Sequence, residues 1–156
     1  MATDSASATG TSTSIGWVDA GIAGIIAGVA FGFLIQYVVG AMQAVGALYT
    51  VPGIATGWVA HLVHSILFAL VYAAIVRWEP LSGAERVWTT GIVVGAGYGL
   101  LLWVVNIWFV WPIWLNAVGF PPGSTFPVPY IAVKPLVGHL VYGIVLGGLY
   151  PALSGR

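Results

Sequence analysis

The stretch HLVHSILFALVY, residues 61–72, decides the fold of this chain, because it returns as HLVYGIVLGGLY at residues 139–150. Both copies are strongly apolar runs with a histidine at the head, which is typical of a helix that crosses a membrane. His61 recurs as His139, whereas His64 is replaced by Tyr142. The sequence therefore predicts two related membrane helices that differ at one polar position.

The composition of the chain points to a lipid environment. Of its 156 residues, 60% are hydrophobic and 5% are charged, whereas a soluble domain carries about 25% charged residues. The net charge is zero and no basic tract occurs, which argues against nucleic-acid binding. Cysteine is absent, so disulfides, thiolate metal sites and cysteine nucleophiles are excluded. We expect a multi-pass protein of the cell membrane, with the lipid bilayer as its partner.

Four stretches approach the roughly 20 apolar residues that cross a bilayer as a helix. They run from about 18 to 39, 57 to 76, 87 to 109 and 134 to 152. The predicted fold class is an all-α membrane protein with one four-helix transmembrane domain over residues 17–156. Residues 1–16 are rich in Ser, Thr, Ala and Gly, and we predict a disordered N-terminal tail there.

The few basic residues predict an orientation. With four spans, Arg77, Arg86 and Arg156 lie on the side of the N-terminus, and Lys134 alone lies on the opposite side. The positive-inside rule then puts both termini in the cytoplasm, and tryptophans near the ends of the spans form an aromatic belt at each interface. The connections 40–56 and 110–133 would face outwards.

The chain also contains an internal repeat. Three blocks recur in order: GVAFGFL at 28–34 with GAGYGLL at 95–101, MQAVG at 42–46 with LNAVG at 115–119, and residues 59–72 with 137–150. We predict two parallel helical-hairpin repeats, about 17–78 and about 86–152, related by a pseudo-twofold axis along the membrane normal.

Glycines spaced by four predict close helix packing. Gly24, Gly28 and Gly32 lie in the first span, and Gly91, Gly95 and Gly99 lie in the third. This small-xxx-small pattern lets helix backbones approach each other. We expect the first and third spans to touch near the cytoplasm and to part towards the outside.

The two repeated histidines form the centre of the candidate site. His61 and His139 lie about one turn inside the outer ends of their spans, and an ionisable residue within a membrane helix indicates function by default. His64 follows His61 by three residues and shares nearly the same helix face. The alternative is that the histidines only hydrogen-bond helix to helix. The full candidate set is His61, His139, His64, Tyr142, Ser65, Asn106 and Trp103.

Several chemistries suit this set. Imidazoles on two helices can ligate the iron of haem b axially, and Ser65, Gly138, Gly143 and Ala60 would leave room for the porphyrin. With His64 as a third donor, the histidines could instead hold zinc, copper or another transition metal. A polar ligand or a proton role is a further alternative, so the cofactor stays open, with haem b as the candidate.

Polar residues outside the spans are weighed more plainly. Gln43 and Asn116 are paired by the repeat and could contact a ligand, but amides near irregular membrane backbone more often satisfy that backbone. Lys134 would snorkel to the interface, or meet an anionic headgroup or a haem propionate.

The segments AVGALYTVPGIATGWVAHLVHSILFALVYAAIV and VGHLVYGIVLGGLYP resemble a family of small integral membrane proteins found mainly in halophilic archaea. The resemblance covers roughly residues 20–151 and implies a four-helix membrane protein, but no activity. The recurring residues of the family correspond here to Gly57, Trp58, His61, His139 and Tyr150. Some members carry the label histidine kinase.

No nucleotide-binding, hydrolase or zinc-protease motif occurs, and no nucleophile–base pair is apparent, so we do not expect an enzyme and exclude a kinase. The functional prediction is a binding or accessory subunit with a histidine site in the outer leaflet. In its sharpest form it is a bis-histidine haem b protein that passes electrons to a membrane complex. The alternatives are a structural or assembly subunit without a cofactor, and a small transporter or channel that works as a homo-oligomer.

Overall fold

The computed structural model describes residues 12–78, 81 and 87–154. The elements, in chain order, are α1 (Ser12–Leu34), the π-helix η1 (Ile35–Val39), α2 (Met42–Ala47), α3 (Ile54–Val76), α4 (Trp88–Trp103), the π-helix η3 (Val104–Val110), α5 (Trp111–Val118) and α6 (Lys134–Ser154). Among the described residues there is no strand, so the protein is all-α there.

Four helical segments are long and apolar enough to cross a membrane, as predicted. They are Gly16–Val39, Ile54–Val76, Trp88–Val118 and Lys134–Ser154. These segments fit a multi-pass membrane protein.

Several predicted boundaries need correction. The third segment stays helical to Val118, because η3 and α5 continue α4 without a break. The connection expected from residue 110 therefore starts at Gly119. The helix α1 begins at Ser12, so the last residues of the predicted disordered tail are helical. Residues 1–11 of that tail, and the basic residues Arg86 and Arg156, lie outside the described residues.

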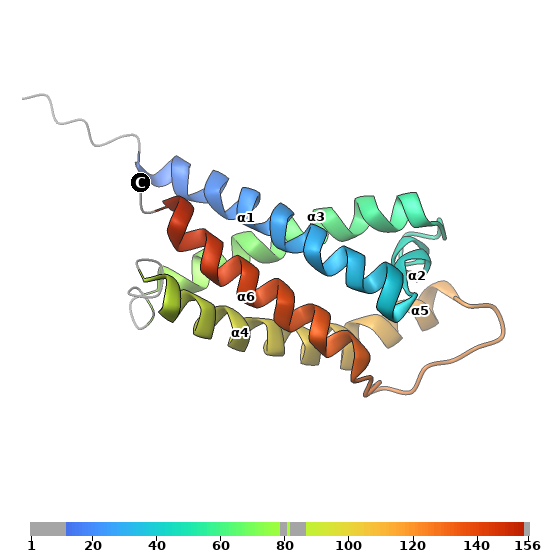
Figure 1. The fold of residues 1–156 in the computed structure, drawn as a ribbon. Helices are drawn as coiled ribbons and strands as arrows, with labels where there is room; N and C mark the ends of the chain where they lie inside the picture. The colour runs from blue at the N-terminus through green and yellow to red at the C-terminus, as the bar shows by residue number, and fades with distance from the viewer. Residues whose placement is uncertain (1–11, 79–80, 82–86, 155–156) are drawn as a thin grey trace, which may run out of the picture.

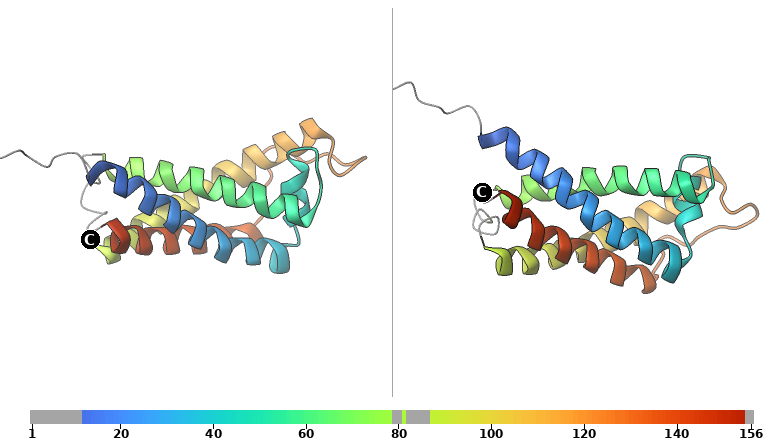
Figure 2. Two further views of the ribbon diagram at one scale, coloured as in Figure 1. Left: turned by 90° about the horizontal axis from the view of Figure 1, so that it is seen from above. Right: turned by 45° about the horizontal axis from the view of Figure 1, so that its top comes forward.

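The long helices form one elongated bundle (Figure 1). α1 packs against both α3 and α6, and α4 packs against α6. The start of α1 and the end of α6 lie at the same end of the bundle, whereas the short helices α2 and α5 lie at the other end (Figure 2). We call these the terminal end and the α2/α5 end.

Tyrosines fill the interior between the helices, and their hydroxyls connect them. Tyr142 on α6 donates to the carbonyl oxygen of Ser65 on α3 at 2.5 Å. Tyr98 on α4 donates to the carbonyl oxygen of Phe68 at 2.8 Å, again on α3. A buried hydroxyl without a partner is costly, so these bonds let tyrosines occupy an otherwise apolar core.

The glycines pack as expected, but between different helices. A Cβ atom built on Gly95 would overlap the carbonyl oxygen of Gly143, and one on Gly91 would overlap that of Gly147. The glycines of α4 therefore bring its backbone against α6. In α1, Gly24 faces Ser65 and Ala69 of α3 in the same way. The expected glycine contact between the first and third spans is wrong, because each glycine row is used against the returning helix.

The π-helices widen the bundle at its α2/α5 end. η1 follows α1 directly and η3 follows α4, so both helices loosen at a similar height. π-helical turns are rare and occur frequently at functional sites. η1 ends at Gly40, whose φ of 74° is left-handed and is therefore accessible to glycine at little cost.

Substitution of Gly95 by alanine should destabilise the bundle by about 1–3 kcal/mol, because the added methyl group forces α4 away from α6. Gly97 on the same helix is a matched control, since no atom lies within 4 Å of its Cβ position, and Gly97→Ala should be neutral or slightly stabilising. Thermal unfolding of the purified protein in detergent, followed by circular dichroism, measures both. Equal melting temperatures for the two variants would contradict the packing described here.

Candidate functional site

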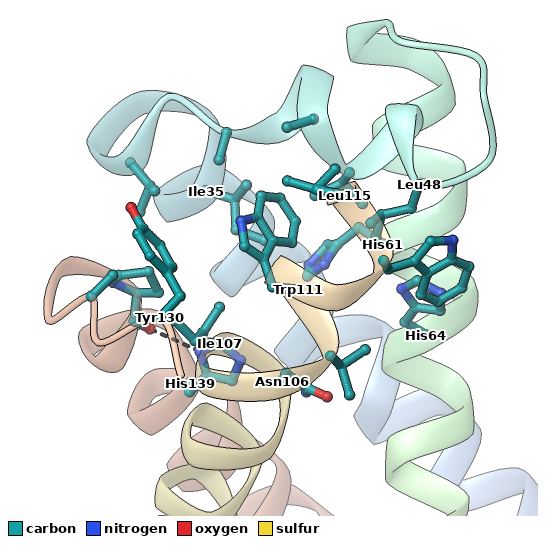
Figure 3. A pocket seen from close by; sticks show the side chains of 18 of the residues that line it. Ile35, Leu48, His61, His64, Asn106, Ile107, Trp111, Leu115, Tyr130 and His139 are labelled. Atoms are coloured by element: carbon teal, nitrogen blue, oxygen red, sulfur yellow. Dashed lines mark hydrogen bonds between the residues drawn. The ribbon is translucent and has the colours of Figure 1, made fainter. Parts of the chain in front are cut away.

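A cavity of about 980 Å³ lies at the α2/α5 end of the bundle. Figure 3 shows His61, His139, Trp111 and Tyr130 arranged around it. Its lining is largely apolar and includes all three histidines and Lys134, but no aspartate or glutamate. Ligand pockets typically measure 300–1,000 Å³, so this cavity is large enough for a sizeable apolar molecule.

Most of the predicted site residues meet at this cavity. Its lining includes His61, His64, Ser65, Asn106, His139 and Tyr142, but not Trp103. Trp103 donates instead from Nε1 to the carbonyl oxygen of Ala132 at 2.8 Å. It therefore anchors the segment that leads into α6 and has a structural role.

The two repeated histidines are buried, with 6% of His61 and 5% of His139 exposed. Nε2 of His61 lies 2.8 Å from the carbonyl oxygen of Gly28 on α1, and Nδ1 of His139 lies 2.8 Å from that of Pro135. A carbonyl oxygen only accepts, so each of these ring nitrogens carries a proton. In a neutral ring, Nδ1 of His61 and Nε2 of His139 then keep their lone pairs for another partner.

Phe31 of α1 packs against both histidines. Its ring centroid lies 5.2 Å from that of His61 and 4.6 Å from that of His139, edge-on in each case. A Cβ atom on Gly138 would overlap the ring of Phe31. The clearance that glycine leaves beside His139 is therefore used, but by a phenylalanine of the protein itself.

This arrangement does not fit haem held by both histidines. A ring at nearly equal distance from two axial imidazoles lies in the plane that the porphyrin must occupy between them. Phe31 is such a ring, so His61 and His139 could hold one haem iron only after Phe31 had left. The bis-histidine prediction thus lacks the flat space that it requires.

The alternative of a three-histidine metal site is wrong. Among the residues that the structure describes, which include all three histidines, no three His, Cys, Asp or Glu side chains lie close enough to hold a metal ion together. The physical reason is that His64 turns to another partner. Its Nε2 lies 2.6 Å from the hydroxyl of Tyr49 in the α2–α3 connection, and Trp114 of α5 packs near both rings.

The segment between α5 and α6 covers one side of the cavity and is held by hydrogen bonds. The side chain of Asn116 accepts from the backbone amide of Phe126 at 2.8 Å and donates to its carbonyl oxygen at 2.9 Å. The amide of Tyr130 donates to the carbonyl oxygen of Trp108 at 2.9 Å. Asn116 therefore satisfies irregular backbone, as favoured above, while its repeat partner Gln43 is exposed.

No protein family, curated protein or solved structure matches this chain.

Sequence reasoning missed Phe31, Trp111 and Tyr130 as cavity residues. Phe31 carried a usable signal, since it occupies in GVAFGFL the position that Tyr98 occupies in GAGYGLL. An aromatic side chain retained at one position of a small-residue helix indicates that the neighbouring glycines make room for it. Trp111 and Tyr130 had no such signal, because their place depends on the path of the chain after η3.

We expect the purified protein to give no bis-histidine haem spectrum when haem is supplied, because Phe31 fills the required plane. Absorption spectra of the oxidised and dithionite-reduced protein measure this directly. Sharp reduced bands that disappear in both His61→Ala and His139→Ala would contradict the expectation. Phe31→Ala is the informative control, since it opens the space between the two rings.

Asn116→Leu should release the segment over the cavity, because the amide and carbonyl groups of Phe126 lose their partner. The loss should be about 1 kcal/mol of local stability per hydrogen bond. Hydrogen exchange of residues 119–133 should become faster, while exchange in α4 and α6 stays unchanged. Gln43→Leu is the matched control and should leave exchange in 119–133 as it is; equal exchange in both variants would contradict the assignment.

Proposed function

We propose that this protein is an integral membrane binding subunit that holds a largely apolar ligand in the cavity at its α2/α5 end. The observation that carries the proposal is a cavity of about 980 Å³ whose wall includes two buried histidines. A core that needed the histidines only as helix contacts would close around them, because protein interiors leave few voids larger than a water molecule.

The polar groups of the cavity would orient the ligand. His61 and His139 each spend one nitrogen on a backbone carbonyl and keep the other, so each can accept one hydrogen bond. Asn106 adds an amide from η3, which can donate and accept. An apolar pocket with a few such groups is the usual form of a small-molecule site.

Internal duplication explains how this site arose, and we include it in the proposal. Each proposed repeat consists of a long helix, a π-helical segment, a short helix and a returning helix: α1, η1, α2 and α3, and then α4, η3, α5 and α6. The repeated histidines head the two returning helices. The binding site would thus lie where two hairpins related by a pseudo-twofold axis diverge.

We also propose that both termini face the cytoplasm. At the terminal end, the guanidinium carbon of Arg77 lies 4.8 Å above the ring of Trp17, an arrangement that suits a cytoplasmic interface. The cavity would then lie in the outer leaflet.

Membership of the family of small four-helix membrane proteins from halophilic archaea is part of the same proposal. The residues that carry the resemblance have structural work at the α2/α5 end. Gly57 lies against the backbone of Met42, and Trp58 donates from Nε1 to the side-chain oxygen of Gln36 at 2.6 Å. His61 and His139 line the cavity.

The binding function is tested with a photoreactive analogue of hexadecanol and the protein in lipid nanodiscs. Light should attach the probe to cavity residues such as Ile107, and excess hexadecanol should prevent it. Ile107→Trp should reduce this labelling about tenfold, a loss of 1.4 kcal/mol, because the indole fills the cavity. Val93→Trp is the matched control, since Val93 is 72% exposed on the same span and does not line the cavity.

Labelling spread evenly over lipid-facing residues, unchanged by Ile107→Trp, would overturn the proposed function.

A further inference from the structure

Lys134 is the one charged residue at the α2/α5 end. The sequence holds no other charged residue between positions 87 and 155, and none between 20 and 76. Lys134 also lines the cavity, whose wall contains no carboxylate. The site therefore has a net positive charge with no internal counter-charge.

Neither the helix nor a neighbouring side chain explains this charge. Lys134 is the first residue of α6, where the positive end of the helix dipole disfavours a cation. It is exposed, and among the described residues it forms no ion pair or side-chain hydrogen bond. Snorkelling accounts for a lysine at the membrane interface, but it would be met equally well at a position away from the cavity.

The cavity is also bordered by side chains that face outwards. Leu67, Val110, Ile131 and Val133 line it and are 53%, 40%, 63% and 66% exposed. For helices in a bilayer, exposed apolar side chains face lipid. A molecule can therefore pass from the bilayer into the cavity along an apolar surface, with Lys134 beside that passage.

We propose that the ligand is an anionic amphiphile, with a phosphate or carboxylate head at Lys134 and a hydrocarbon chain in the cavity. This rests on the proposed binding function and adds the charge of the ligand. A cation would meet an unopposed ammonium group, and a small anion alone would leave the apolar cavity unfilled. A chain with an anionic head satisfies both parts of the site.

Competition between two probes with the same chain tests the charge. Hexadecyl phosphate and hexadecanol each displace the photoreactive hexadecanol from the protein in nanodiscs of zwitterionic lipid. Hexadecyl phosphate should compete about fivefold better, as an exposed ion pair is worth up to about 1 kcal/mol. In Lys134→Gln the two probes should compete equally, whereas Lys134→Arg should keep the preference. Arg77→Gln, which removes a cation at the terminal end, should also keep it.

The outcomes separate the two proposals. If both probes displace equally in the natural protein, or hexadecanol displaces better, the anionic ligand is wrong while the binding function stands. If neither displaces the photoreactive probe from the cavity, both proposals fail. Inorganic phosphate distinguishes the source of the anion: displacement of hexadecyl phosphate by millimolar phosphate at constant ionic strength would point to a free anion and overturn the amphiphile.

Discussion

Where α4 meets α6, glycine faces glycine and the two backbones touch. Gly91 and Gly95 lie against the carbonyl groups of Gly147 and Gly143, and no side chain separates the helices there. In a lipid environment the hydrophobic effect does not drive helices together, so such van der Waals contact between backbones is a main source of association. Much of the remaining geometry follows from this contact, because it sets how closely the terminal half of the bundle packs.

The opposite end of the bundle is wider because the glycine contacts end there. α1 and α4 pass into π-helical turns, and the chain continues into the short helices α2 and α5. A second, smaller core of Ala47, Leu48 and Leu115 joins these short helices. The cavity lies between this small core and the tight half of the bundle. Its size therefore depends on the height at which helix packing changes from backbone contact to side-chain contact.

The sequence predicted the parts of the fold that depend on local composition. Apolar length located the four helices, and the spacing of Gly91, Gly95 and Gly99 located a packing face. It did not identify the partner of that face, because a row of glycines fits any close helix. The corresponding spacing on α3 and α6 did indicate that His61 and His139 turn inwards. The hydrogen-bond partners could not be predicted, since Gly28 and Pro135 offer backbone carbonyls that no side-chain pattern reveals.

The tyrosines of the core determine where the cavity ends. Tyr142 closes its floor with 2% of its surface exposed, and its hydroxyl is engaged by the carbonyl group of Ser65. Below it, Leu146 and Tyr150 are fully buried. The cavity is thus a cul-de-sac rather than one half of a pore: whatever fills it leaves by the side from which it came. Passage to the other face would require these aromatic rings to move and their hydroxyls to give up backbone partners within an apolar core.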